Sequence, residues 1–166
     1  MNVAEFVNTY LEDAKRSEAN TGVPALLSLA QSALESGWSS AKPGNAMFGI
    51  KAAAAWPGQK QLLVTREVFA DPNQGGRFPE VLSIAPRADG KFDYKVRDWF
   101  RAYDSPSGSF DDHGKMLRGN PRYAPCFETH DPREFARRIA AAGYATDPNY
   151  GKALIDVIAT IEKASA

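Results

Sequence analysis

One glutamate of this chain stands where it could act as a proton donor. Residues 24–34 contain proline only at the first position and no glycine, which predicts a helix that ends near Gly37. Glu35 then falls in the last turn, on the same side as Gln31 and at the edge of an apolar sector. The negative end of the helix dipole and an apolar neighbour such as Trp38 favour a carboxyl that keeps its proton there. Such a group can protonate a leaving group. The expected apolar sector contains Leu26, Leu27, Ala30, Ala33 and Leu34.

The sequence around this glutamate resembles a known family. Five motifs follow one another along most of the chain: ESGW (35–38), NAMFGIK (45–51), FRAYDS (100–105), NPRYA (120–124) and AGYATDPNY (142–150). Together they are similar to the glucosaminidase family of peptidoglycan hydrolases, which includes the wall-cutting domain of the flagellar rod-cap protein. The resemblance implies a lysozyme-like fold and cleavage of the β-1,4 bond between N-acetylglucosamine and N-acetylmuramic acid.

The resemblance also implies catalytic roles for three residues. Glycoside hydrolysis needs an acid for the departing oxygen and a second group that stabilises or attacks the oxocarbenium ion. Glu35 takes the acid role, and Glu67 corresponds to the acidic residue that the family carries on a strand. Tyr144 corresponds to an aromatic residue at the reaction centre, where it could hydrogen-bond the acetamido group or orient Glu35. The second role stays open, because the acetamido group of the substrate could be the nucleophile and other acids lie in the same lobe: Asp71, Glu80, Asp89 and Asp93.

Several polar and aromatic residues are candidates for binding the sugars. The predicted substrate-binding residues are Gln31, Trp38, Asn45, Phe48 and Tyr123. Trp56 and Trp99 are further candidates for stacking on sugar faces, although each is equally typical of a small core.

The pattern of the chain predicts a mainly helical α+β fold with a small antiparallel hairpin lobe. Asn2 and Glu5 fit the capping box of a first helix that ends at residues 20–22. Three extended runs lie near residues 61–69, 81–84 and 91–97, the last two joined by an Asp-Gly turn. Helices are expected from residues 106, 132 and 148, each after a capping residue and a proline. We expect a loop over residues 36–51 to line a cleft between helices and hairpin lobe, within a single domain over residues 1–166.

Composition excludes several classes of partner. Twenty basic and twenty acidic side chains leave no formal net charge, so nothing drives binding to nucleic acid or to an anionic membrane surface. No apolar run is long enough to span a bilayer. Cys126 is the only cysteine, which excludes an internal disulfide. The two histidines, His113 and His130, are expected at the surface or on helix faces and are too few for a zinc site. We therefore expect no metal ion and no other cofactor.

Alternative chemistries fit the sequence less well. Ser39 and Lys42 have the Ser-x-x-Lys spacing of penicillin-binding enzymes, but the other motifs of that class are missing. A lytic transglycosylase is an alternative, although such enzymes usually carry a Gly-Leu-Met-Gln block where this chain has FGIK at 48–51. The non-enzymatic alternative is a glycan-binding module, and the motif context of Glu35 disfavours it.

The location of the substrate raises the question of delivery. The N-terminus has neither the basic run nor the apolar segment of a secretory signal, yet peptidoglycan lies outside the cytoplasm. We expect a protein made in the cytoplasm and exported by a specialised route, with a type VI secretion effector favoured over a phage endolysin or a flagellar subunit. Such a toxin would act in the periplasm of target cells. Its expected partner besides peptidoglycan is a cognate periplasmic immunity protein that fills the cleft and pairs with Glu35.

Overall fold

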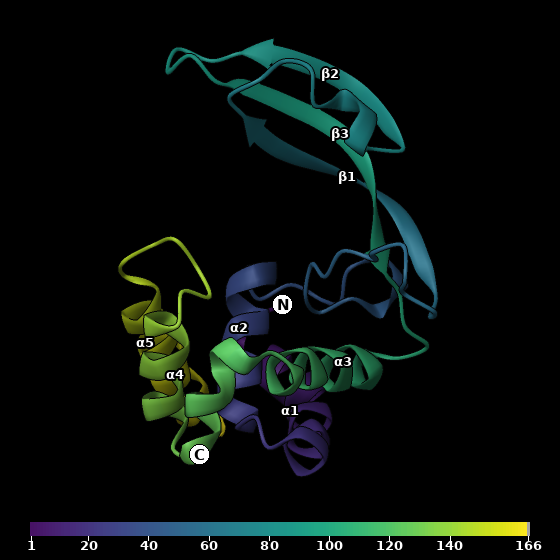
Figure 1. The fold of residues 1–166 in the computed structure, drawn as a ribbon. Coiled ribbons are helices and arrows are strands. Elements are labelled where there is room, and N and C mark those ends of the chain that lie inside the picture. The colour runs from purple at the N-terminus through teal and green to yellow at the C-terminus, as the bar shows by residue number, and fades with distance from the viewer. Residues whose placement is uncertain (166) are drawn as a thin grey trace. The chain divides into compact units, whose positions relative to one another are not determined.

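A computed structural model describes residues 1–165 of the chain. These residues form two compact units, one made of residues 1–48 with residues 103 onward, the other of residues 49–102. The first unit is helical and the second is built on a sheet (Figure 1). The single domain expected over residues 1–166 stays a prediction, and its last residue lies outside the described part.

The helical unit begins with a well-capped helix. In α1 (Val3–Thr21) the Asn2 side chain accepts from the Glu5 amide at 2.9 Å, and the Glu5 carboxylate accepts from the Asn2 amide. Gly22 ends the helix in the left-handed conformation at φ 80°. The predicted capping box is therefore confirmed. It sets the start of the helix whose Phe6 and Val7 are fully buried.

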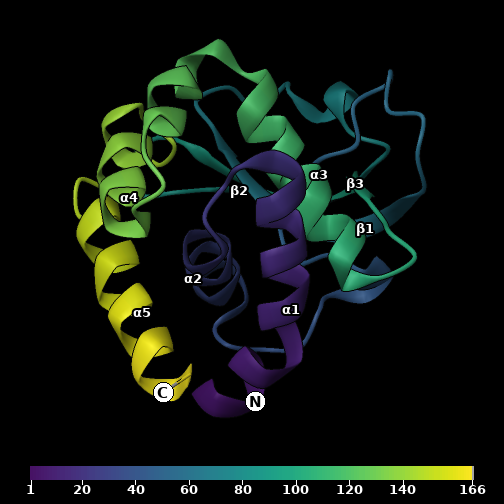
Figure 2. The same ribbon diagram turned by 90° about the horizontal axis from the view of Figure 1, so that it is seen from below.

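The helix α2 (Ala25–Ser36) is the centre of this unit. Figure 2 shows it nearly end-on, with α1, α4 and α5 arranged around it. Gly37 ends α2 at φ 60°, and the amide of Trp38 donates to the Ala33 carbonyl at 3.1 Å. Because neighbours cover α2 on several sides, eight of its twelve residues are buried, including Ser28 and Ser32.

The predicted apolar sector of α2 is only partly correct. Leu27, Ala30 and Ala33 are buried, but Leu34 is 41% exposed. Gln31, expected off the edge of the sector, is only 1% exposed, because its amide is engaged by a residue of α5. A single hydrophobic stripe is a poor guide for a helix that is packed on several sides.

The rest of the helical unit follows the predicted order. It contains η1 (Pro43–Asn45), α3 (Pro106–Gly119), the 3-10 segment η3 (Pro121–Glu128), α4 (Pro132–Ala141) and α5 (Tyr150–Ser165). The Asp131 side chain caps α4 by accepting from the Glu134 amide at 2.7 Å. The last helix begins at Tyr150, two residues later than expected, because Asp147 instead accepts from the Asn149 amide and closes a turn. The segment η3 was not expected from the sequence.

The second unit contains an antiparallel sheet. Its strands are β1 (Lys60–Phe69), β2 (Glu80–Pro86) and β3 (Phe92–Arg101), with η2 (Gly75–Arg77) between the first two. The order is β1-β3-β2, so that β3 lies in the middle (Figure 1). Gly90, at φ 78°, turns the predicted hairpin between β2 and β3. Tyr94 is the buried centre of this unit, and its hydroxyl donates to the Asp71 carbonyl at 2.7 Å. The predicted α+β class with a small hairpin lobe is confirmed.

Candidate active site

Glu35 lies in the last turn of α2, one turn after Gln31. Its side chain is exposed, and within residues 1–165 it forms no hydrogen bond or ion pair. Gly37 and Trp38 both adopt positive φ directly after it, at 60° and 61°. Because an L-residue such as Trp38 rarely takes this conformation, the chain leaves the helix through a constrained turn. The backbone that carries Glu35 is thus constrained, and its carboxyl is open to a ligand.

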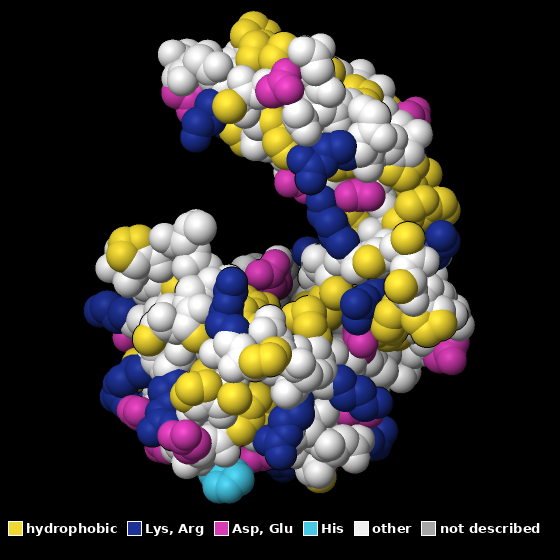
Figure 3. All heavy atoms as spheres, in the orientation of Figure 1, with side chains coloured by type: hydrophobic (Ala, Val, Ile, Leu, Met, Phe, Trp, Pro, Cys, Tyr) yellow, Lys and Arg dark blue, Asp and Glu magenta, His cyan; other side chains and the backbone are white. Residues whose placement is uncertain are grey.

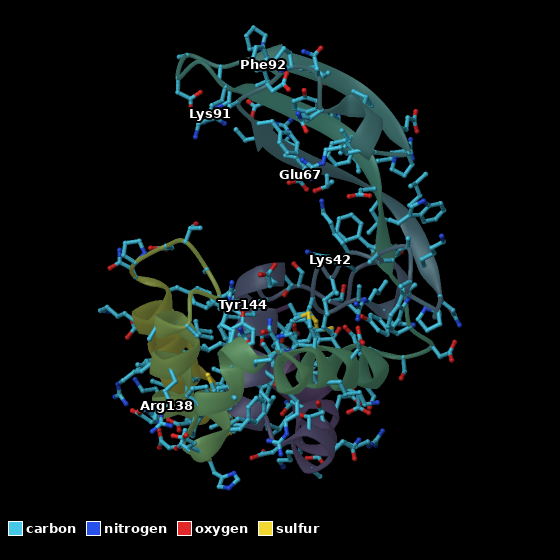
Figure 4. All side chains as sticks on the ribbon, viewed as in Figure 1. Lys42, Glu67, Lys91, Phe92, Arg138 and Tyr144 are labelled. Carbon is cyan, nitrogen blue, oxygen red and sulfur yellow. The ribbon has the colours of Figure 1, made fainter. Side chains whose placement is uncertain are left out.

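Three tyrosine rings pack together in the helical unit. Tyr144 stacks on Tyr150 with ring centroids 5.6 Å apart and an interplanar angle of 13°, and it lies 6.0 Å from Tyr123. Tyr144 comes from the loop between α4 and α5 (Figure 4). Gly143, at φ 79°, lets this loop turn so that the Tyr144 amide donates to the Ile139 carbonyl at 3.2 Å. A glycine immediately before the tyrosine is therefore a backbone requirement of this loop.

Glu35 lies close enough to the tyrosines to act on them electrostatically. Burial raises the pKa of Tyr144 above its ordinary range, and neighbouring Tyr150 and Glu35 raise it further. Burial also raises the pKa of Tyr150 to about 12, with Glu35 adding to an effect that a hydrogen bond from Gln31 opposes. Both phenols therefore remain hydrogen-bond donors over the physiological pH range. Glu35 thus lies near Tyr144 and Tyr150, and Tyr123 adjoins Tyr144. The catalytic and binding roles of these residues stay predictions.

Tyr150 is a residue of this cluster that the sequence analysis missed. The Gln31 Nε2 atom donates to the Tyr150 hydroxyl at 3.0 Å, across 119 residues of chain. Tyr150 is the final residue of the AGYATDPNY motif and the first residue of α5. The available signal was its place in a motif that already supplied Tyr144. Gln31 itself is thus a buried support for Tyr150, and a role in binding substrate stays a prediction.

His113 of α3 lies next to the tyrosine cluster. It is fully buried on a face of α3, so of the two expected placements the surface is wrong and the helix face is confirmed. Its ring stacks on Phe48 with centroids 3.9 Å apart, and its Nε2 atom lies 3.5 Å from the Tyr144 hydroxyl. Burial lowers the pKa of His113 to about 3, so the imidazole is neutral at physiological pH. His130 is exposed, as expected.

The other predicted binding residues of the helical unit occupy different depths. Phe48 and Tyr123 are 3% and 7% exposed, so they form the wall behind the surface. Trp38 is half-buried and packs edge-to-face on Phe6 at 5.4 Å. Asn45 takes a positive φ of 53° and its Nδ2 atom donates to the Tyr103 carbonyl at 2.9 Å. Asn45 therefore fastens the loop before α3, and its contact with a sugar remains a prediction.

Glu67, the predicted second catalytic group, belongs to the sheet unit. It lies on β1 opposite Tyr94 of β3 and is labelled on that strand in Figure 4. Lys51 Nζ lies 2.6 Å from the Glu67 carboxylate and 3.0 Å from that of Asp98. Burial alone would lower the pKa of Lys51, but the hydrogen bonds to both carboxylates hold it above its ordinary value. Glu67 is therefore held by a cation.

The alternative acids of the sheet unit have other tasks. Asp71 accepts from the amide and side chain of Asn73, which orders the turn after β1. Arg97 binds Glu80 at 3.0 Å across β2 and β3. Asp89 and Asp93 both pair with Arg87 at the hairpin. None of these four acids pairs with Lys51, the lysine of the NAMFGIK motif that binds Glu67.

Each of the two tryptophans in the sheet unit makes a cation–π contact. Arg101 lies 4.1 Å over the ring of Trp56, and Lys60 lies 4.6 Å over that of Trp99. Both rings have a face occupied by protein, which leaves them less suited to sugar stacking than the sequence alone implied.

The structure also bears on metal ions, membranes and surface charge. Among residues 1–165 no three His, Cys, Asp or Glu side chains gather as a metal site would require. No helix in that range combines the length and hydropathy needed to cross a membrane. On the face in Figure 3, basic and acidic side chains are interspersed over both units.

Comparison with known proteins places the chain in a family. The family model described as "Glucosaminidase: Mannosyl-glycoprotein endo-beta-N-acetylglucosaminidase" matches residues 11–163. The chain belongs to the glucosaminidase family. Because this match runs from α1 to α5, the family inferred from five separate motifs is confirmed over nearly the whole chain.

Named members of the glucosaminidase family share this sequence. The chain is 32% identical over 159 residues to peptidoglycan hydrolase FlgJ of Salmonella typhimurium, covering 92% of this chain and 44% of FlgJ. It is 28% identical over 140 residues to exo-glucosaminidase LytG of Bacillus subtilis, covering 80% of this chain and 42% of LytG. The chain thus spans a little under half the length of these relatives.

A solved structure agrees with the sequence comparison. The glycoside hydrolase domain of Salmonella typhimurium FlgJ matches with a TM-score of 0.75 and 30% identity, covering 99% of this chain and 91% of that domain. The chain therefore shares the fold of that domain over almost its whole length.

Proposed function

We propose that this chain hydrolyses the β-1,4 bond between N-acetylglucosamine and N-acetylmuramic acid in peptidoglycan, with Glu35 as the proton donor. The observation that carries the proposal is the placement of Glu35. It is an exposed carboxyl in the last turn of the central helix, near Tyr144 and Tyr150 and without a cation partner among the described residues. A carboxyl in this setting can pass its proton to a glycosidic oxygen.

The proposed reaction divides its work among few groups. Glu35 protonates the departing oxygen, and positive charge develops at the anomeric carbon of the other sugar. The Tyr144 hydroxyl, kept protonated by its burial, donates to the acetamido group or to Glu35. Glu67 is proposed as the second catalytic group, and it would activate a water. If Glu67 proves dispensable, the acetamido group of the substrate takes its place.

The exact bond and the mode of attack are part of the proposal. The family description names an endo-acting enzyme, whereas the relative LytG is named an exo-glucosaminidase. We propose endo cleavage, as the motifs imply. A lytic transglycosylase would leave an anhydro sugar, and a glycan-binding module would leave the polymer intact.

Mass spectrometry of the fragments released from purified peptidoglycan tests the proposal. We expect fragments of several repeats with N-acetylglucosamine at the new reducing end, and none from the Glu35→Gln variant. Single sugars released from chain ends would indicate exo cleavage, and reducing-end N-acetylmuramic acid would indicate a muramidase. Anhydromuramic ends would indicate a transglycosylase, and intact polymer would support the binding module.

We also propose that the protein reaches the periplasm of target cells by a specialised export route and meets a small inhibitor protein there. The exposure of Glu35 supports an inhibitor that covers it, because an unpaired carboxyl near aromatic side chains is a suitable anchor. The test is co-expression in the periplasm with the product of each neighbouring gene. An immunity protein should restore growth and bind the purified chain, whereas a neighbouring holin gene would favour the phage endolysin.

A further inference from the structure

We propose that Tyr150 is a positioning residue for Glu35, with Gln31 fixing the direction of its hydroxyl proton. In this arrangement Gln31 donates to the Tyr150 oxygen, and Tyr150 in turn donates to the Glu35 carboxylate formed when the acid gives up its proton. The inference rests on the proposed role of Glu35 and adds two residues that support it.

The first hydrogen bond has a defined direction in the structure. The Gln31 Nε2 atom donates to the Tyr150 hydroxyl oxygen at 3.0 Å, and the Gln31 Oε1 atom is buried without a protein partner. The Tyr150 oxygen therefore accepts, and its own proton must point to another group.

Glu35 is the group best placed to receive that proton. It follows Gln31 by four residues, so both side chains leave the same side of α2. The stacked ring of Tyr144 covers a face of Tyr150 and presents no acceptor in its plane. The side chains that surround the pair, with the elements that supply them, are Glu35 of α2, Tyr123 and Arg122 of η3, Tyr144 of the loop before α5, and His113 of α3 behind Tyr144.

Among these groups Glu35 is the one that becomes an anion during the reaction. His113 stays neutral at working pH, Tyr123 and Tyr144 stay phenols, and the Arg122 guanidinium lies 6.0 Å from the Tyr123 ring. A donor directed at Glu35 stabilises its carboxylate more than its acid form. The contact therefore strengthens as the proton leaves, which assists the transfer.

The test compares pH–activity profiles of three variants on purified peptidoglycan: Tyr150→Phe, Gln31→Met and the double variant. Each single change should lower kcat about tenfold and leave KM nearly unchanged. Losing a donor to a carboxylate favours its protonated form, so the basic limb of the profile should move to higher pH by up to about one unit. Because the two residues act in series, the double variant should lose little more than either single one.

Tyr10→Phe is the matched control. It removes a part-buried hydroxyl that accepts from the Ala41 amide at 2.8 Å, with a similar cost in stability but no link to Gln31. Its basic limb should coincide with that of the wild type. Unshifted limbs in Tyr150→Phe and Gln31→Met, or strictly multiplicative losses in the double variant, would overturn the inference. If Glu35→Gln keeps wild-type activity the proposed function fails as well, whereas an inactive Glu35→Gln with an unshifted Tyr150→Phe limits the failure to this inference.

Discussion

The two compact units each carry one proposed catalytic carboxyl, and they treat it in opposite ways. In the helical unit, Glu35 is exposed in the last turn of α2 and lies close enough to Tyr144 and Tyr150 to raise the pKa of both phenols. In the sheet unit, Glu67 is half-buried on a strand and bound by Lys51, which also holds Asp98. Glu35 is left open to a ligand, whereas Glu67 already has a cation partner. This difference is the structural basis for proposing different catalytic roles for the two carboxyls.

The largest effect is expected when the proposed acid is removed. Glu35→Gln keeps the shape of the side chain but has no acidic proton to give, so we expect hydrolysis to fall about 10²–10⁴-fold. Release of soluble fragments from peptidoglycan measures the loss, and circular dichroism checks the fold. A folded variant with more than about a tenth of wild-type activity would contradict the assignment, since general acid catalysis contributes far more than that.

Glu67→Gln tests the other carboxyl. We expect a fall in kcat on the order of 10²-fold with little change in KM, because a base that activates water acts on the transition state. Asp93→Asn is the control, since it removes an acid of the same unit that pairs with Arg87. Wild-type rates for Glu67→Gln would transfer the second role to the acetamido group of the substrate.

The buried histidine of the helical unit should make the folding stability depend on pH. The pKa of His113 is about 3 in the folded chain and about 6.5 when unfolded, so the unfolded state binds more protons between these values. Folding stability should therefore be intact above about pH 6.5 and fall by up to about 1.4 kcal/mol per pH unit as the pH drops toward 3.

Urea unfolding at several pH values measures this slope. His113→Phe retains a ring against Phe48. Its free energy of unfolding should fall less steeply with decreasing pH than that of the wild type, by up to about 1.4 kcal/mol per pH unit. His130→Asn removes the exposed histidine and should leave the slope unchanged. Equal slopes in wild type and His113→Phe would contradict the effect.

The smallest expected effect concerns the cation that holds Glu67. Lys51→Met removes the charge but keeps an apolar stem near Phe78, so we expect a few-fold loss of kcat and little loss of stability from this partly exposed pair. The loss should vanish in the Glu67→Gln background if Lys51 acts through Glu67. An equal loss of kcat in both backgrounds would show that Lys51 does not act through Glu67.

Local sequence signals predicted much of this molecule. The capping box at Asn2, the glycine after α2 and the Asp-Gly hairpin each act within a few residues of chain, so their geometry could be predicted without knowing the fold. The motif resemblance predicted the family for the same reason, because each motif is short and continuous. Glu35 and Tyr144 were found in this way.

Long-range packing explains what the sequence did not predict. Gln31 is buried with Tyr150, a residue 119 positions away, as its hydrogen-bond partner, whereas Leu34 of the expected apolar sector is 41% exposed. His113 is buried because Phe48, from a distant loop, stacks on it at 3.9 Å. No local pattern contains these partners.

The central position of α2 has a consequence for how the acid moves. Backbone amides of a helix packed on several sides can exchange with solvent only when the surrounding helices separate, which is close to global unfolding. Glu35 is attached to the last turn of that helix, and the Trp38 amide ties the following turn back to Ala33. The backbone of α2, which carries Glu35 in its last turn, should therefore exchange slowly, whereas β2, with every residue exposed, can open locally.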